Sequence, residues 1–192
     1  MRSSQVSGPV ILLDACVLAP PTLREVLFRC AAEGLFEPRW STRIEEEWRA
    51  AARKRDPDLP DPLLDADRAQ ARARFPAALV EGWEALEGPL SLPDWNDRHV
   101  LAAAIAAKAE ILLTDNLRDF PKRILAGHGI EREAADPFLW RLAGDAPDRF
   151  ATALAFFSEI SGISLDALPA HLKRCRLPRF AKAARPLLEA RA

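Results

Sequence analysis

The sequence predicts an α/β fold in which helices flank a parallel β-sheet, followed by an all-helical C-terminal part. Two short segments rich in apolar residues, PVILL at 9–13 and EILLT at 110–114, are typical of strands buried on both faces. Between them, apolar residues recur at the three- and four-residue spacing of amphipathic helices. Strands that alternate with helices in this way indicate a parallel sheet with crossover helices.

The first 55 residues predict two strands and two helices. In chain order these are strand 9–13, helix 21–33, strand 36–40 and helix 42–55. Gly34 is a suitable stop for the first helix. The second helix has Ser41 or Thr42 as its N-cap, and Glu45 stands where the capping-box partner of Thr42 would be.

The middle of the chain predicts two more helices before the strand at 110–114. The prolines and aspartates of residues 56–62 indicate a loop, and a helix at 63–74 follows. Residues 88–97 form a second loop, which leads into an alanine-rich helix at 98–109. Ligands of parallel sheets bind beyond the carboxyl ends of the strands, so the residues that follow each strand are candidates for a site.

After residue 134 the pattern changes to helices alone. Four helical stretches are separated by Gly, Pro or Ser-Gly: 136–144, 147–161, 164–175 and 178–192. We therefore expect two domains, an α/β domain at 1–134 and a C-terminal helical extension at 135–192.

The composition indicates a soluble protein that stays in the reducing cytoplasm. The apolar run near the N-terminus covers only residues 10–13, which is too short for a signal peptide or a membrane span. The three cysteines, Cys16, Cys30 and Cys175, form no C-x-x-C pair and are odd in number. Neither a zinc site nor a disulfide framework is therefore expected.

The net charge of −1 gives the whole chain no signature of polyanion binding, but the charges are unevenly spread. Residues 171–191 carry seven Lys or Arg against the single acid Glu189. A second basic stretch covers residues 49–55 and includes Arg49 and Arg53. Both stretches could contact phosphates, or they could be solvated helix surfaces.

Carboxylates remain as the candidates for chemistry, because the chain has no phosphate-binding loop motif, no G-x-S-x-G and no C-x-x-C. Asp14 ends the first strand, Asp97 begins a helix, and Asp115 and Asp119 follow a later strand. All four can meet at the carboxyl edge of the sheet. Such a cluster needs cations, and hard oxygen ligands favour Mg²⁺ or Mn²⁺.

Each acid also has a purely structural interpretation. Asp14 could be a turn residue, Glu46 and Glu47 could be solvent-facing members of a charged helix, and Asp97 could interact with a helix dipole. Taken singly these interpretations are the more common ones. Taken together, the positions favour a site.

Three segments resemble the signature blocks of PIN domains, particularly those of the VapC-like toxins. They are VILLDACVL, STRIEEEW and LPDWNDRHVLAAAIAAKAEILLTDNLRDFP. The resemblance covers roughly residues 9–130, and the third segment is its most specific part. It implies a three-layer α/β/α fold. The C-terminal helices are more loosely similar to the extension that some VapC-like toxins carry.

The resemblance implies that four acids are catalytic: Asp14, Glu47, Asp97 and Asp119. These residues and Asn116 would bind the metal. Glu47 precedes a large apolar residue, as the family's helix glutamate does, and Glu46 is the alternative. Likewise Asp115 is the alternative to Asp119.

The resemblance also implies an outer set around the ligands, formed by Cys16, Thr114 and Asp94. The family commonly has asparagine or threonine where Cys16 stands, and Asn116 is neutral, so both departures could weaken metal binding. Four basic residues are candidates for substrate contact: Arg98, His99, Arg49 and Arg53.

By the same resemblance, the chain is expected to be a Mg²⁺- or Mn²⁺-dependent endoribonuclease and the toxin of a toxin–antitoxin pair. Its partners would be RNA and a cognate antitoxin protein, and it could form a homodimer; no membrane is expected to be involved. Two alternatives remain open: a DNA-directed or structure-specific nuclease, and a non-catalytic module that binds RNA or a partner.

Overall fold

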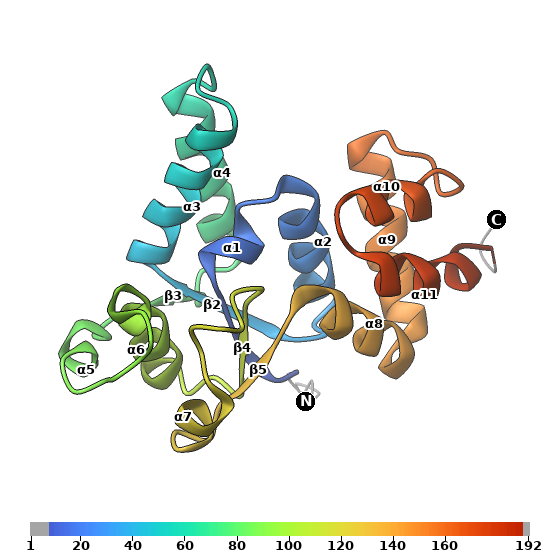
Figure 1. Cartoon of the computed structure of the whole chain (residues 1–192). Coiled ribbons are helices and arrows are strands. Elements are labelled where there is room, and N and C mark those ends of the chain that lie inside the picture. Colours follow the sequence, from blue (N-terminus) through green and yellow to red (C-terminus); the bar gives the residue numbers. More distant parts are fainter. Residues whose placement is uncertain (1–7, 190–192) are drawn as a thin grey trace, which may run out of the picture. The chain divides into compact units, whose positions relative to one another are not determined.

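A computed structural model describes residues 8–189 of the chain (Figure 1). The chain forms two compact units, which are described separately. The sheet unit comprises Val10–Pro21 and Pro38–Ala134, and the helical unit comprises Met1–Pro9, Thr22–Glu37 and Ala135–Ala192. Arg191, which belongs to the basic stretch at 171–191, lies outside the described residues. Within the described part of the chain, no helix is long and apolar enough to cross a membrane.

A five-stranded parallel sheet forms the centre of the sheet unit, with the strand order β3-β2-β1-β4-β5. The strands are β1 (Val10–Leu13), β2 (Glu37–Ser41), β3 (Leu79–Val80), β4 (Ile111–Leu113) and β5 (Glu131–Glu133). In the two central strands, Ile11 is paired with Ile111 and Leu13 with Leu113. These side chains are buried. The predicted α/β class with a parallel sheet is confirmed.

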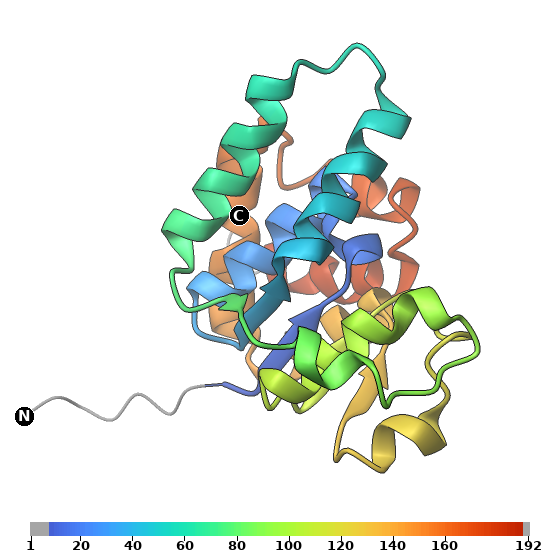
Figure 2. The same cartoon turned by 90° about the vertical axis from the view of Figure 1, so that its left-hand side faces the viewer.

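Six helices and one 3₁₀ turn surround these strands in the sheet unit (Figures 1 and 2). They are α1 (Ala15–Leu18), α3 (Thr42–Arg55), α4 (Asp61–Arg74), α5 (Glu84–Glu87), η1 (Trp95–Asp97), α6 (Arg98–Ala106) and α7 (Lys122–Ala126). Helix α6 packs against both central strands. Alanines at 102–104 are fully buried, since only small side chains allow a helix to approach a sheet so closely.

The strand order reverses direction between β1 and β4. From β1 the chain steps outward to β2 and β3, then returns to the other side of β1 for β4 and β5. At such a switch point the loops after the two central strands separate and leave a crevice at the carboxyl edge of the sheet. Asp14 and Thr114 directly follow β1 and β4 and therefore face this position.

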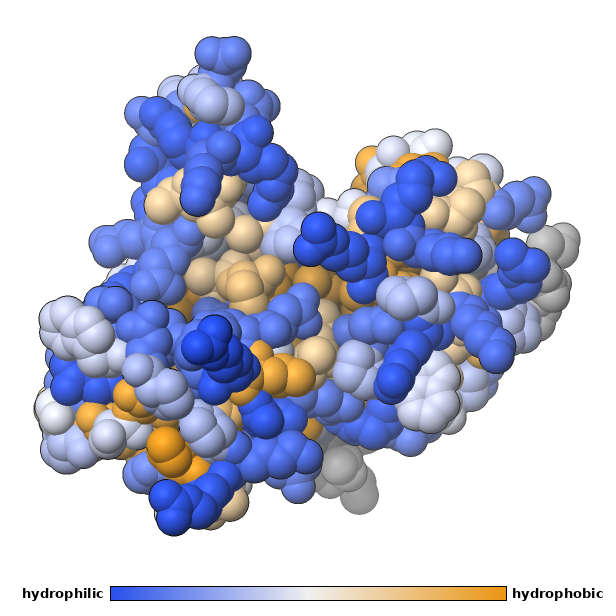
Figure 3. Space-filling view, viewed as in Figure 1, coloured by the Kyte–Doolittle hydropathy of each residue, from blue (hydrophilic) through white to orange (hydrophobic). Residues whose placement is uncertain are grey.

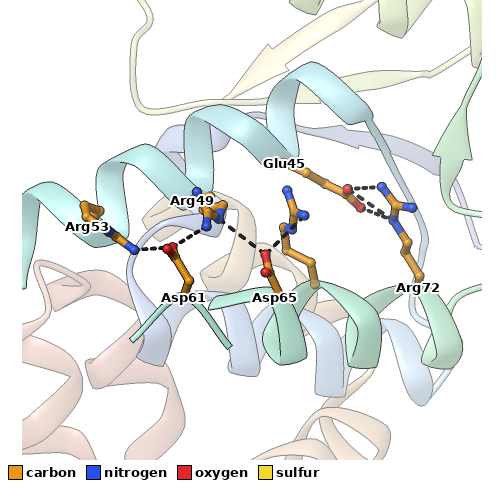
Figure 4. A network of polar contacts seen from close by, with 7 residues as sticks. Glu45, Arg49, Arg53, Asp61, Asp65 and Arg72 are labelled. Carbon is orange, nitrogen blue, oxygen red and sulfur yellow. Dashed lines mark hydrogen bonds and ion pairs between the residues drawn. The ribbon is translucent and has the colours of Figure 1, made fainter. Parts of the chain in front are cut away.

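The first turn of α3 has a different cap from the predicted capping box. Ser41 is the N-cap, and its hydroxyl accepts the backbone N–H of Ile44 at 3.3 Å. Glu45 is fully buried and accepts the indole N–H of Trp40 at 2.8 Å and the guanidinium of Arg72 on α4 (Figure 4). Ser41, one of the two predicted N-caps, is therefore confirmed, and the helix begins at Thr42 as expected. The predicted capping box of Thr42 with Glu45 is wrong, because Glu45 pairs with Trp40 and Arg72 instead.

Helices α3 and α4 form a hairpin whose outer part is almost entirely hydrophilic on the face shown in Figure 3. Arg49 is paired with Asp61 and Asp65, and Arg53 is paired with Asp61 (Figure 4). These exposed ion pairs contribute little to stability singly. The buried carboxylate of Glu45 is a different case, because an uncompensated charge at that position would be costly.

Several short elements were not predicted from the sequence: α1, β3, α5, α7 and β5. Strand β3 has only two residues, which is too short to be recognised as a pattern. Strand β5 is an edge strand with the charged sequence Glu-Arg-Glu, so it has no apolar pattern. Helix α4 begins at Asp61, two residues before the predicted start. Proline is tolerated in the first turn of a helix, so Pro62 does not delay the start.

The helical unit contains five helices of the described chain and the segment that follows the first of them. The helices are α2 (Pro21–Ala32), α8 (Ala135–Asp145), α9 (Pro147–Ser161), α10 (Leu168–Arg174) and α11 (Pro178–Glu189). Phe36 packs edge-on against Phe138, and Phe150 packs edge-on against Phe180. Because residues 22–37 belong to this unit, the C-terminal helices are not packed by themselves. The domain boundary at 134/135 stays a prediction.

We predict that Arg72→Ala lowers the free energy of unfolding by about 2–3 kcal/mol, because it leaves the fully buried carboxylate of Glu45 with only the indole N–H of Trp40 as a strong partner. Urea unfolding measures the loss. The control is Arg68→Ala, which removes an exposed pair with Asp65 on the same helix and should cost less than about 1 kcal/mol. Equal losses in the two variants would show that the Glu45 pair has no special weight.

Candidate active site at the switch point of the sheet

Asp14 is fixed by hydrogen bonds that follow from the pairing of β1 with β4. Its backbone N–H continues the parallel ladder by donating to the carbonyl of Leu113 at 3.1 Å. The Thr114 hydroxyl donates to the Asp14 Oδ2 at 2.6 Å. Burial raises the pKa of the Asp14 carboxyl, and the hydrogen bonds from Thr114 and Cys16 oppose this shift. The fold thus holds a carboxylate in a place where its charge is unfavourable.

Cys16 lies in the hydrogen-bond environment of Asp14, as its predicted outer role requires. The thiol donates to Asp14 Oδ2 at 3.1 Å and lies 3.4 Å from the Thr114 hydroxyl. Its sulfur accepts the backbone N–H of Asp115 at 3.3 Å. Burial and the Asp14 charge raise the thiol pKa to about 12, so the group stays a neutral donor. A thiol is a weaker donor than a hydroxyl or amide.

Asp97 reaches the same crevice from the start of α6. Its Oδ2 accepts the side-chain amide of Asn116 at 3.1 Å, which joins the loop after β4 to the start of α6. Asn116 is held in turn by its backbone N–H, which donates to the Thr114 hydroxyl at 3.0 Å. Asp94 caps the 3₁₀ turn before Asp97 by accepting the backbone N–H of Asn96 at 2.9 Å.

The pKa of Asp97 is raised to about 6. Partial burial is the largest cause, and the neighbouring charges of Asp14, Asp94 and Asp119 add to it, while His99 opposes it. The carboxylates of Asp14 and Asp119 therefore lie near enough to Asp97 for their charges to act on it.

Glu47 joins the cluster from the second turn of α3. Its charge contributes to the raised pKa of Asp14, and its Oε1 lies 2.8 Å from Nε2 of His99 on α6 and 3.9 Å from Nε of Arg43. Of the three consecutive glutamates, Glu45 is buried in the contacts with Trp40 and Arg72 described above, and Glu46 is exposed beside Arg49 and Arg53. Only Glu47 is placed with the other acids.

His99 was expected to contact substrate, but it is buried and directed at Glu47. The residue is 1% exposed, packs edge-on against Trp83, and its Nδ1 is buried without a hydrogen-bond partner among the described residues. The network therefore assigns the ring hydrogen to Nε2, which donates to Glu47. Helix α6 is buried on nearly all sides, so a residue at its second position points inward rather than to a substrate.

The other three predicted substrate residues differ in their surroundings: Arg98 lies beside Asp97, whereas Arg49 and Arg53 lie in ion pairs with α4. Arg98 is half-buried beside Asp97, donates to the carbonyl of Trp95 at 3.0 Å, and stacks on the Trp95 ring. Arg49 and Arg53 are engaged in the ion pairs with α4, so their charges are already balanced. A substrate role for these two stays a prediction without support from the geometry. Trp95 was not singled out from the sequence, because an isolated tryptophan follows no pattern.

The donor set fits a hard divalent cation. Burial raises the pKa of Asp97, and the charges of Asp14, Asp94 and Asp119 raise it further, so a cation among these carboxylates would be stabilised. As the side chains stand, no three His, Cys, Asp or Glu of the described residues are grouped closely enough to hold an ion. Glu47 is directed to His99, and Asp97 to Asn116.

We predict that, with a chelator present, Asp97→Asn raises the free energy of unfolding at neutral pH. The folded-state pKa of Asp97 lies above its usual 3.8, so deprotonation costs the folded protein stability, and this loss develops as the pH rises from about 4 through 6. Because the carboxyl is partly solvated, the gain at pH 7 should be about 1 kcal/mol, or about 2–4 °C in Tm. The control Asp58→Asn changes an exposed loop aspartate. An equal gain below pH 4 would contradict this explanation.

Two comparisons with known proteins agree with this geometry. Residues 10–118 match the PIN domain family. The mycobacterial protein Putative ribonuclease VapC50, from Mycobacterium tuberculosis, is 44% identical over 45 residues, which are 23% of this chain and 27% of that protein. The match thus spans about a quarter of that relative's length. No solved structure shows a significant match. The family match covers more than half of the chain and the expected α/β/α architecture is present, so the chain belongs to the PIN domain family, a family of nucleases.

Proposed function

We propose that the protein is a Mg²⁺- or Mn²⁺-dependent endoribonuclease and the toxin of a toxin–antitoxin pair. The observation that supports the proposal is that the hydrogen bonds of Thr114 and Asn116 hold Asp14 and Asp97 at the switch point of a PIN-domain sheet, where the charge of Glu47 acts on Asp14 and that of Asp119 on Asp97. An acidic cluster at this place disfavours the apo protein, which is the electrostatic signature of a cation site.

In this proposal Asp14, Glu47 and Asp97 hold the cation, with Asn116 and Asp119 completing the set. A bound divalent cation stabilises negative charge on the phosphate and lowers the pKa of water at the site. Thr114 and Cys16 both donate to Oδ2 of Asp14 and so orient its carboxylate. Asn116 orients Asp97. Such outer contacts commonly matter tenfold or more for metal affinity or rate.

The choice of RNA rather than DNA as substrate is supported by the VapC50 match alone, because a metal-binding acidic site could cleave the phosphodiester bonds of either nucleic acid. A cognate antitoxin as partner is part of the proposal as a family expectation. Cytoplasmic location and a homodimer remain part of the proposal as family expectations. Phosphate contacts would come from Arg98 beside the acids and from exposed basic residues of the helical unit: Lys173, Arg174, Arg176 and Arg179.

Cleavage assays on matched single-stranded RNA and DNA with Mn²⁺ test the proposed function. The wild type should cut the RNA at discrete positions. Asp14→Asn should cut it at least about a hundredfold more slowly, because it removes ligand charge while its hydrogen bond with Thr114 can persist. Equal rates for the two proteins would show that the site is misassigned. Cutting of DNA alone would show that the substrate class is wrong.

The fourth acid can be identified by comparing Asp119→Asn with Asp115→Asn. Asp119 contributes to the raised pKa of Asp97, whereas Asp115 is exposed. We expect Asp119→Asn to lower the cleavage rate by about tenfold or more and to raise the Mn²⁺ concentration needed for half-maximal rate. Asp115→Asn should change neither quantity by more than about twofold. The opposite ranking would transfer the role to Asp115.

His99 is predicted to act through Glu47 and not on the substrate. His99→Gln can keep an N–H directed at the Glu47 carboxylate, whereas His99→Ala cannot. In a Mn²⁺ titration of the cleavage rate, His99→Ala should therefore need about tenfold more metal, and His99→Gln should lie between it and wild type. KM for RNA should stay the same in both, since His99 is buried. If the two variants changed only KM for RNA and not the metal requirement, His99 would instead contact the substrate.

A further inference from the structure

Trp95 is an exposed tryptophan at the edge of the acidic site. It begins the 3₁₀ turn η1, which ends at Asp97, and 67% of its surface is accessible. Asp97 is only two residues away and belongs to the acidic cluster. The exposed ring and the Asp97 carboxylate are thus carried by the same short turn.

The backbone that carries Trp95 is held on both sides. Before it, Asp94 accepts the backbone N–H and the side-chain amide of Asn96, at 2.9 and 3.0 Å. After it, Nε of Arg98 donates to the Trp95 carbonyl at 3.0 Å. An exposed ring on a fixed turn costs less entropy to engage than the same ring on a free loop.

A cation already lies on the Trp95 ring. The guanidinium carbon of Arg98 is 5.5 Å from the ring centroid, a cation–π distance. Indole and guanidinium together present an aromatic surface with a positive charge beside it, directly next to a group of carboxylates that would repel a polyanion. Proteins that bind unpaired nucleic acid use this combination, with the ring stacking on a base and the cation near a phosphate.

Other exposed apolar side chains of the described chain show why Trp95 differs. Trp140, Phe156 and Ile160 are about half exposed but belong to the helical unit, and scattered exposed residues of this kind are ordinary on protein surfaces. Trp95 combines exposure, a fixed backbone and a stacked cation with a place beside the acids.

We propose that Trp95 stacks on an unpaired base of the RNA substrate, while Arg98 contacts an adjacent phosphate. The inference rests on the proposed function and deepens it. A base inside a duplex is already stacked on its neighbours, so the device selects RNA that has an unpaired nucleotide next to the scissile phosphate. Stacking accepts every base, and the preference is for strand conformation rather than for sequence.

Binding of a fluorescein-labelled single-stranded RNA to full-length protein tests this proposal, with Asp14→Asn as the parent to prevent cleavage. Trp95→Ala should raise Kd by about tenfold, and Trp95→Phe by less than about threefold, because phenylalanine can still stack. Trp140→Ala is the matched control, an exposed tryptophan of the helical unit, and should bind like the parent. In the wild-type background, Trp95→Ala should raise KM, and a fully paired duplex should compete poorly.

Equal Kd values for the parent and Trp95→Ala would overturn the proposal, and so would Trp95→Leu binding as well as Trp95→Phe, since leucine offers apolar area without stacking. Melting curves should be the same for all Trp95 variants, because the side chain is exposed. If neither the wild type cuts RNA nor the parent binds it, the proposed function itself fails and this inference fails with it. If the wild type cuts RNA and Trp95→Ala has the same KM, only the stacking role is wrong.

Discussion

Parallel pairing of β1 with β4 is the constraint on which the site depends. The pairing puts Leu13 opposite Leu113, so the next residues of both strands, Asp14 and Thr114, come within hydrogen-bond distance. Thr114 then fixes Asn116, and Asn116 fixes Asp97 at the start of α6. A shift of one residue in this register would break all of these hydrogen bonds, because every side chain of the shifted strand would then point to the opposite face of the sheet.

The cluster is unfavourable for the protein by itself. Burial disfavours the charges of both Asp14 and Asp97, and the neighbouring acids add to this effect. The structure compensates partly, through hydrogen bonds from Thr114 and Cys16 and through the contact of Glu47 with His99. Acids that only served stability would be placed as Glu45 is, against an arginine and an indole N–H. The contrast between these two groups distinguishes a site from a structural ion pair.

Much of the architecture could be predicted from the sequence, because buried strands and alanine-rich helices have clear patterns. The position of Asp14 at the carboxyl edge of the sheet follows from the strand that precedes it, whereas Glu47 lies within a helix and was expected only from the family resemblance. The edge strand Glu131–Glu133 could not be predicted, since pairing along one edge demands no apolar residues. The role of Glu45 depends on Trp40 and Arg72, which lie on other elements. His99 next to Asp97 suggested a substrate contact, and only the packing of α6 shows that it faces Glu47.

The central claim, that these carboxylates are gathered to hold a divalent cation, is tested most directly by titrating Mn²⁺ into the chelator-treated protein in a calorimeter. Wild type should bind Mn²⁺ with a measurable heat and gain thermal stability in proportion to the occupancy. Asp14→Asn and Asp97→Asn should each lose most of that binding, while Asp58→Asn, in an exposed loop, should keep it. Equal Mn²⁺ affinity in all four proteins would contradict the claim, because it would place the cation away from the switch point of the sheet.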